Sequence, residues 1–275
     1  MALVLIAPAD AKTKMPDFVE AGAVKDKPTV SFVQSKAYLL IRSDAPTPIL
    51  LMRIPDADDQ AAYDEVRGAE YEKARSKYEK KLVSYDRAVA RKAAGASVNV
   101  PEKPDEVNEQ NFDFMPFARV ATVSIGPMNR FAKGDEGAST YLQEVKPGSY
   151  RIYGLIMAGA NGVFAGTCFC MGSVAFEAKA GEIVDLGFLD LRNQVREKVE
   201  GDSSVPMLYE SLVKLPGSAE AEMDSRLDNF NVRPVRYWPV GKLPNYYGLA
   251  IGRMPEIPGV MRYDRDRIVD LTKGD

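Results

Sequence analysis

The chain has 275 residues, of which 45% are hydrophobic and 27% are charged, and its formal net charge is -3. This length is enough for one large or two small domains, and the mildly acidic balance lacks the basic field that nucleic-acid binding requires. The sequence contains no histidine, which excludes Ser-His-Asp and Cys-His catalytic systems and the zinc sites built on histidine. We therefore expect no catalytic residues, no metal and no cofactor.

The first eleven residues resemble the end of a secretory signal. An apolar run from Leu3 to Ala7 is followed by a small-x-small cleavage pattern at residues 9–11, so that Lys12 would begin the mature chain. A basic region before the apolar run is missing. The segment is therefore either part of an upstream-extended signal, which predicts a periplasmic or secreted protein, or a short buried strand of a cytoplasmic one. No apolar run reaches the length of a membrane span.

Strand-like texture dominates most of the remaining chain. Short stretches rich in β-branched, aromatic and aliphatic residues are separated by Pro- and Gly-containing turn signals. This pattern predicts a mainly β fold, an antiparallel β-sandwich formed by residues 12–55 and 113–191. The second of the predicted strands is expected to pair with the first. The strands are predicted at residues 29–42, 49–54, 117–125, 149–157, 163–170, 174–178 and 182–189.

A different texture begins at Asp56 and predicts one long helix ending near Ala94. The stretch contains no proline and one glycine, Gly68, and its charges change from acidic to basic along the chain, in agreement with the helix dipole. Asp56 or Asp58 is suited to cap the start, and Gly95 to end the helix. With a Pro- and charge-rich return linker, the helix forms an insertion over residues 56–112.

Three tyrosines recur every seven residues within this predicted helix: Tyr71, Tyr78 and Tyr85. Residues seven apart lie on one side of a helix and form a narrow stripe, as in a coiled coil. The stripe either packs onto the sandwich of its own chain or docks to another chain.

The C-terminal region, residues 192–275, combines many prolines with aromatic residues. Aromatic residues at this density argue against free disorder, so we interpret the region as an extended arm over the sandwich or over a neighbouring chain. Its aromatic residues are candidates for partner contacts, or alternatively for stacking on a sugar ring or another small molecule. These candidates are Tyr237, Trp238, Tyr246 and Tyr247.

Cys168 and Cys170 are the only cysteines. On an unbent strand, residues two apart share a face, but their Cβ atoms are too far apart for a disulfide. Gly166 and Gly172 would permit the necessary bend. The pair is therefore a disulfide, two buried free thiols, or a redox or metal-binding pair.

Two segments resemble a known family. Residues 142–152, Leu-Gln-Glu-Val-Lys-Pro-Gly-Ser-Tyr-Arg-Ile, resemble the Pro-Gly-x-Tyr segment of transthyretin-like and carboxypeptidase-regulatory-like β-sandwich domains. Residues 174–187 resemble the closing hairpin of these domains, in which Ala-Gly separates two strands. Many exported bacterial proteins of unknown function carry such domains, so the resemblance implies an adhesive or structural role without catalysis.

These features favour a non-catalytic protein of the bacterial envelope that acts by interaction. Its expected partner is an envelope protein or further copies of the same chain, with no nucleic acid involved. Two alternatives remain at this stage. The first is a module that binds a small molecule or glycan through the aromatic residues of the tail. The second is a hydrolase based on paired carboxylates, which would need two acidic side chains facing each other across a cleft.

Overall fold

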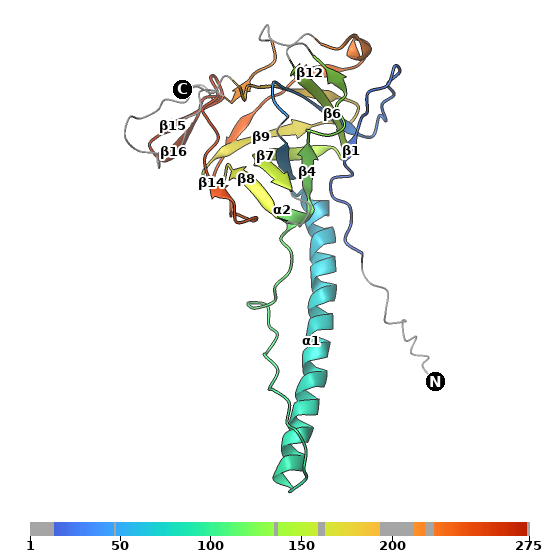
Figure 1. Cartoon of the computed structure of the whole chain (residues 1–275), viewed down its shortest axis with the longest axis vertical. Helices are drawn as coiled ribbons and strands as arrows, with labels where there is room; N and C mark the ends of the chain where they lie inside the picture. Colours follow the sequence, from blue (N-terminus) through green and yellow to red (C-terminus); the bar gives the residue numbers. More distant parts are fainter. Residues whose placement is uncertain are drawn as a thin grey trace. The chain divides into compact units, whose positions relative to one another are not determined.

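A computed structural model describes residues 14–46, 48–134, 137–158, 163–192, 212–217 and 223–273. These residues form two seven-stranded sheets, a two-stranded hairpin and one long helix (Figure 1). The predicted mainly β chain with one long helix is confirmed. The predicted signal segment, residues 1–11, lies outside the described residues, as does much of the C-terminal region between residues 193 and 222.

The contacts of the described residues divide the chain into two compact units. One unit contains Pro55–Phe117 and holds the helix α1 (Ala57–Ala93). The other contains Asp17–Ile54 and the residues from Ala118 onward, and it holds both sheets. The second unit also contains a hairpin of the strands β15 (Met261–Asp264) and β16 (Arg267–Asp270). The short helix α2 (Phe117–Val120) lies where the chain passes from the first unit to the second.

The first sheet is mixed rather than antiparallel, and its main path runs β1-β6-β2-β10-β11. Strand β2 pairs antiparallel with β6 but parallel with β10, and β12 also pairs parallel with β10. The expected purely antiparallel arrangement is therefore wrong for this sheet. Its strands are β1 (Gly22–Ala23), β2 (Ala37–Ser43), β5 (Ala132–Lys133), β6 (Ser139–Val145), β10 (Ile183–Leu189), β11 (Val213–Lys214) and β12 (Val232–Pro234).

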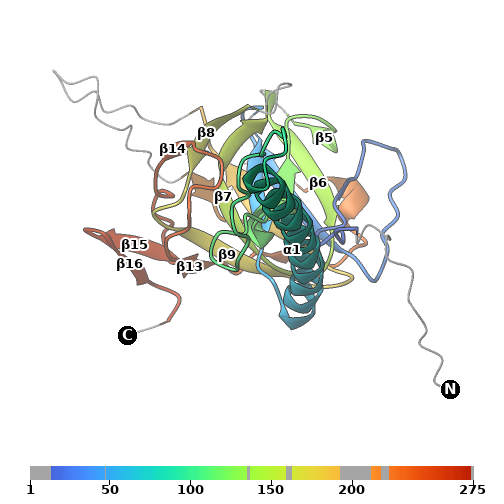
Figure 2. The same ribbon diagram turned by 90° about the horizontal axis from the view of Figure 1, so that it is seen from below.

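The second sheet has the main path β13-β9-β7-β3-β4, with β8 beside β7 and β14 beside β8. Figure 2 shows β7 and β8 side by side, in agreement with their antiparallel pairing. Only the short β14 pairs parallel, with β8. The strands are β3 (Ile49–Arg53), β4 (Thr122–Ile125), β7 (Gly148–Ala158), β8 (Phe164–Cys168), β9 (Ser173–Ala178), β13 (Trp238–Val240) and β14 (Ala250–Ile251).

Two strand pairings predicted from the sequence are wrong. Strand β9 pairs with β7 and β13 of the second sheet, whereas β10 belongs to the first sheet, so residues 174–187 form a crossing between sheets and not a hairpin. Likewise, β3 pairs with β4 and β7 and not with β2. A short turn fixes where a strand ends, but it does not fix which neighbour completes the next strand.

The central strands β2, β3 and β10 are buried at every position. A strand that is covered on both faces gains apolar burial at successive residues, which explains why their sequences are mainly apolar. Their charged residues, Arg42, Arg53 and Asp185, are buried as well. On one face of the first sheet, Tyr38, Leu40 and Leu142 pack with Phe131 and with loop residues. On one face of the second sheet, a separate cluster forms around the two cysteines and residues of the C-terminal region.

Arg53 determines the turn that joins the two sheets at residues 146–148. Its side chain is 2% exposed, and its Nη1 donates a hydrogen bond to the carbonyl oxygen of Pro147 at 2.5 Å. The guanidinium group also lies 5.8 Å from the centre of the Tyr150 ring. Gly148 adopts a φ of 147°, and a Cβ atom there would lie 2.2 Å from Nη1 of Arg53. The turn therefore requires glycine for both conformation and space.

The insertion starts and ends at neighbouring positions of the second sheet. Strands β3 and β4 pair antiparallel, with Met52 opposite Thr122, and the backbone N–H of Arg53 donates to the carbonyl oxygen of Ala121 at 2.8 Å. Helix α1 begins after Asp56, whose side chain caps Asp59 in a reciprocal capping box, and it ends before Gly95, which has a φ of 86°. The predicted helix boundaries are confirmed.

We expect Gly148→Ala to lower the free energy of unfolding by roughly 1–3 kcal/mol, because the added Cβ collides with the buried Arg53 guanidinium. Gly22→Ala is the control, since a Cβ at Gly22 meets nothing within 4 Å. Urea unfolding of both variants measures the difference. Equal stabilities of the two variants would contradict the role assigned to Arg53.

We also expect the sheets to form without the insertion. Replacing residues 56–116 with a short Asn-Gly turn joins two strands that already pair, so cooperative unfolding should persist. The thermal midpoint should move by no more than about 4 °C, which corresponds to roughly 1 kcal/mol for a chain of this size. Loss of cooperative unfolding in differential scanning calorimetry would show that the second unit depends on the helix.

Candidate functional site

The predicted site residues fall into two regions, one in each unit. The first region surrounds the cysteines on the second sheet, and the second is the helix α1 with the segment that follows it.

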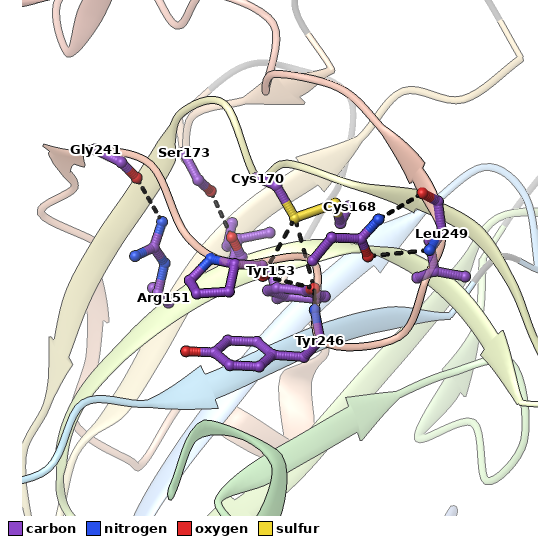
Figure 3. Close-up of a disulfide and its surroundings, with 11 residues drawn as sticks. Arg151, Tyr153, Cys168, Cys170, Ser173, Gly241, Tyr246 and Leu249 are labelled. Atoms are coloured by element: carbon purple, nitrogen blue, oxygen red, sulfur yellow. Dashed lines mark hydrogen bonds between the residues drawn. A yellow bond between two sulfur atoms is a disulfide. The ribbon is translucent and has the colours of Figure 1, made fainter. Parts of the chain in front are cut away.

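The structure joins Cys168 and Cys170 by a disulfide bond (Figure 3). Strand β8 ends at Cys168, and the chain turns before Gly172, so Cys170 lies beyond the regular strand. This turn supplies the bend that two cysteines two residues apart require. Cys168 is 0% exposed and Cys170 is 3% exposed, so the bond is shielded from solvent.

Tyr153 of β7 connects this disulfide to the C-terminal region. Its hydroxyl accepts a hydrogen bond from the backbone N–H of Tyr246 at 2.9 Å and donates one to the carbonyl oxygen of Pro244 at 3.2 Å (Figure 3). The hydroxyl oxygen also lies 3.5 Å from Sγ of Cys170. Since a disulfide sulfur carries no hydrogen, this approach is a packing contact. Burial raises the pKa of Tyr153 above its usual value.

Residues 244–249 are fixed over the same face of the sheet. The Asn245 side chain donates to the carbonyl oxygen of Leu249 and accepts from its backbone N–H, at 2.7 and 3.0 Å. The Tyr247 ring lies 4.5 Å from the ring of Phe164, and the Arg119 guanidinium lies 5.2 Å from the centre of the Tyr247 ring. Burial raises the pKa of Tyr247.

The four aromatic candidates of the tail therefore differ in their surroundings. Tyr237 is 4% exposed, packs on the Phe176 ring and donates to the carbonyl oxygen of Leu186 at 2.9 Å. The side chain of Tyr237 thus belongs to the core, which argues against the expected partner contact. Trp238 is half-buried on the edge strand β13, and Tyr246 and Tyr247 are half-buried within the cluster around Tyr153. The rings of Tyr246 and Tyr247 are thus largely engaged inside the chain, which disfavours the sugar-stacking alternative.

Arg151 is a buried cation that the sequence interpretation missed. It is 9% exposed, and its Nη2 donates to the carbonyl oxygen of Gly241 at 2.9 Å (Figure 3). Nε of Arg151 has no hydrogen-bond partner among the described residues. Burial lowers the pKa of Arg151 to about 10. An arginine in an alternating strand predicts an outward-facing position, and only the loop at residues 241–247 turns this position into a covered one.

In the other unit, the return segment after α1 runs alongside the helix (Figure 1). The hydroxyl of Tyr63 donates to the carbonyl oxygen of Met115 at 2.9 Å, and the ring of Tyr63 contacts the rings of Phe114 and Phe117. Further along, the Tyr71 ring lies 5.3 Å from the ring of Phe112. We call α1 and this return segment, residues 56–117, the helical hairpin.

Part of the tyrosine stripe packs on the return segment, a surface that the sequence interpretation did not name, and docking of the stripe to another chain stays a prediction. Tyr71 packs on Phe112 of the return segment, and Tyr78 lines a groove of about 850 Å³ between α1 and residues 101–107. Tyr85 is half-buried. The sequence signal for this packing was present, since Phe112 and Phe114 are the only aromatic residues between Gly95 and Pro116.

The groove has a mixed but mainly basic lining. Tyr78 and the prolines of residues 101 and 104 provide its apolar surface, and Glu102 and Asp105 its acidic groups. Its cationic side chains are Lys77, Lys80, Lys81 and Lys103.

No protein-family model, curated protein or solved structure matches this chain. The resemblance at residues 142–152 and 174–187 therefore rests on those residues alone. Within the described ranges, no group of three His, Cys, Asp or Glu side chains is arranged to hold a metal ion. Among the helices that the structure describes, none has the length and apolar character to cross a membrane.

We expect Tyr153→Phe to lower the free energy of unfolding by about 1 kcal/mol, because the backbone N–H of Tyr246 and the carbonyl oxygen of Pro244 lose the hydroxyl that both contact and keep only their mutual hydrogen bond at 3.1 Å. Tyr78→Phe is the matched control, since no hydrogen bond of its hydroxyl is present in the described structure. Chemical denaturation followed by tryptophan fluorescence compares the two. Equal losses in both variants would remove Tyr153 from its anchoring role.

Proposed function

We propose that this chain is an exported, non-catalytic structural protein that presents its helical hairpin to another protein. The observation that carries the proposal is the small burial of α1, a 37-residue helix whose only buried residues are Asp59, Tyr63 and Val66. A helix of this length that leaves most of its residues on the surface is not maintained for the sake of a core. Its exposed surface is best explained as a contact surface.

In this proposal, the two sheets of the second unit form a β-sandwich, and the chain of this sandwich carries the helical hairpin. The two sheets approach each other at Tyr237, which precedes β13 of the second sheet and donates to Leu186 of β10 in the first sheet. The rings of Tyr150 and Phe176 stack 6.1 Å apart beside it. The sandwich and the resemblance to transthyretin-like domains support the same structural role, and the C-terminal arm would complete the cover of the second sheet.

The absence of catalysis is proposed from the roles of the buried charged groups. Arg42 and Asp185 form a two-pronged ion pair between β2 and β10, with Nη2 of Arg42 2.6 Å from each carboxylate oxygen. Asp185 also accepts from the backbone N–H of Gly187. Asp190 pairs with Lys214 at 2.8 Å. These carboxylates are engaged in holding strands together, which argues against the paired-carboxylate hydrolase.

Export is proposed from the disulfide between Cys168 and Cys170. Disulfides form and persist in oxidising compartments such as the periplasm and are rare in the reducing cytosol. The signal-like residues at the start of the chain support the same location.

The proposal predicts a specific neighbour for the helical hairpin in the native cell. A photo-crosslinking amino acid at Val83, which is 57% exposed on α1, should give one discrete adduct on irradiation. The same amino acid at Ile251, which is 60% exposed on the second unit, is the control and should give none. Cell fractionation should place the adduct in the periplasm or envelope. A diffuse background from both positions would refute the docking role.

A further inference from the structure

We infer that the partner of the helical hairpin is a second copy of the same chain, whose hairpin lies antiparallel beside it. This inference rests on the proposed docking role and adds the identity and direction of the partner.

The charges of the hairpin are strongly polarised along its length. From Asp56 to Glu72 the helix carries seven acidic residues and a single basic one, Arg67. From Lys73 to Lys103 the hairpin carries nine basic residues and three acidic ones, and from Asp105 to Asp113 it again carries acidic residues and no basic one. The hairpin is therefore acidic where it joins the second unit in sequence and basic around its turn.

Ion pairs within the hairpin neutralise only part of this charge. Arg67, Lys73 and Arg75 all pair, with Glu109, Glu70 and the two carboxylates Glu72 and Glu79, respectively. From Lys77 onward the pattern changes, because no cation of the described helix makes an ion pair within the chain. These cations are Lys77, Lys80, Lys81, Arg87, Arg91 and Lys92, and Lys103 follows them on the return segment.

Several acidic groups of the opposite end are equally without ion pairs. Asp58, Asp64 and Glu65, in the first half of α1, pair with no cation in the described structure. Asp105 makes no ion pair either, but it lines the groove together with Lys77, Lys80 and Lys81 and so belongs to the basic half. Both unpaired sets lie on the surface, where opposite charges attract across the distance between two packed helices.

A second copy supplies the reversed charge pattern that this hairpin needs. Turned end to end, its acidic half lies beside the basic half of the first copy, and the same contact is repeated at the other end. Such a pair is closed by a two-fold axis, so the association stops at a dimer. A parallel pair would place like charges together and is disfavoured. The helix spans about 55 Å at 1.5 Å per residue, which provides room for both contacts.

The test uses two charge-reversed variants of the full chain. One is Lys80→Glu with Lys81→Glu, and the other is Asp64→Lys with Glu65→Lys. Each alone places like charges in both contacts of the dimer, so each should be monomeric in analytical ultracentrifugation. An equimolar mixture should form a heterodimer, because the reversed halves then complement each other. This restoration excludes misfolding as the cause of the separate losses.

The matched control carries the same change in charge on the second unit, Arg236→Glu with Lys242→Glu, and should remain dimeric. Raising the salt from 0.1 M to 1 M, which shortens the Debye length from about 10 Å to about 3 Å, should weaken the unmodified dimer by roughly tenfold or more. A monomeric unmodified chain at 0.1 M salt, or a mixture that stays monomeric, would overturn the inference.

The two proposals fail in different ways. A monomeric chain that still gives a Val83 adduct to a different protein would overturn the second copy but retain the docking role. A monomeric chain without any discrete adduct would overturn both.

Discussion

The pairing of β3 with β4 is the constraint on which the arrangement of this chain depends. Met52 and Thr122 are direct neighbours in the ladder although the whole helical hairpin separates them in sequence. Because the ladder continues through Arg53 and Ala121, the hairpin leaves and re-enters the sheet without interrupting it. Arg53 serves this junction twice, since its backbone extends the β3–β4 ladder while its side chain holds the turn before β7.

The second sheet is completed by chain segments that are distant in sequence. Tyr153 binds the loop at residues 244–246, and Arg151 binds the carbonyl oxygen of Gly241, so neighbouring positions of β7 hold the C-terminal region in place. Both sulfur atoms of the disulfide belong to residues buried in the same cluster. Burial of Arg151 without an ion pair costs free energy, and the hydrogen bond from its Nη2 to the carbonyl oxygen of Gly241 offsets part of this cost.

The sequence allowed good prediction where local chemistry decides the outcome. The start of α1 follows from the capping box of Asp56 and Asp59, and its end follows from Gly95, because these signals act over one helical turn. Strand positions also followed from local texture. Strand partners did not, because the segment at residues 174–187 is compatible with a hairpin or with a crossing between sheets. The two possibilities differ only in strand pairing: β10 pairs with β2 in the first sheet, whereas β9 pairs with β7 in the second.

The candidate site was predictable to a similar extent. The proximity of Cys168 and Cys170 required only their spacing and nearby glycines, but the burial of Tyr237 and Arg151 depends on segments more than fifty residues away. The tyrosine stripe was recognised as a packing surface, but the contact of Tyr71 with the return segment was not predicted. Phe112 and Phe114 indicated that the return segment packs on the helix. The many polar residues and prolines around them led instead to the interpretation of the segment as a linker.

The capped helix has a further consequence for the order in which the chain folds. Closing a flexible loop between β3 and β4 would cost conformational entropy that grows with its length. Helix α1 forms from local contacts within microseconds, and the aromatic contacts of the return segment then direct the chain back along it. Once the hairpin has formed, only a few flexible residues separate the two strands, so the search for their pairing is short. We therefore expect the hairpin to offset the entropic cost of its own length, without being required for the sheet to form.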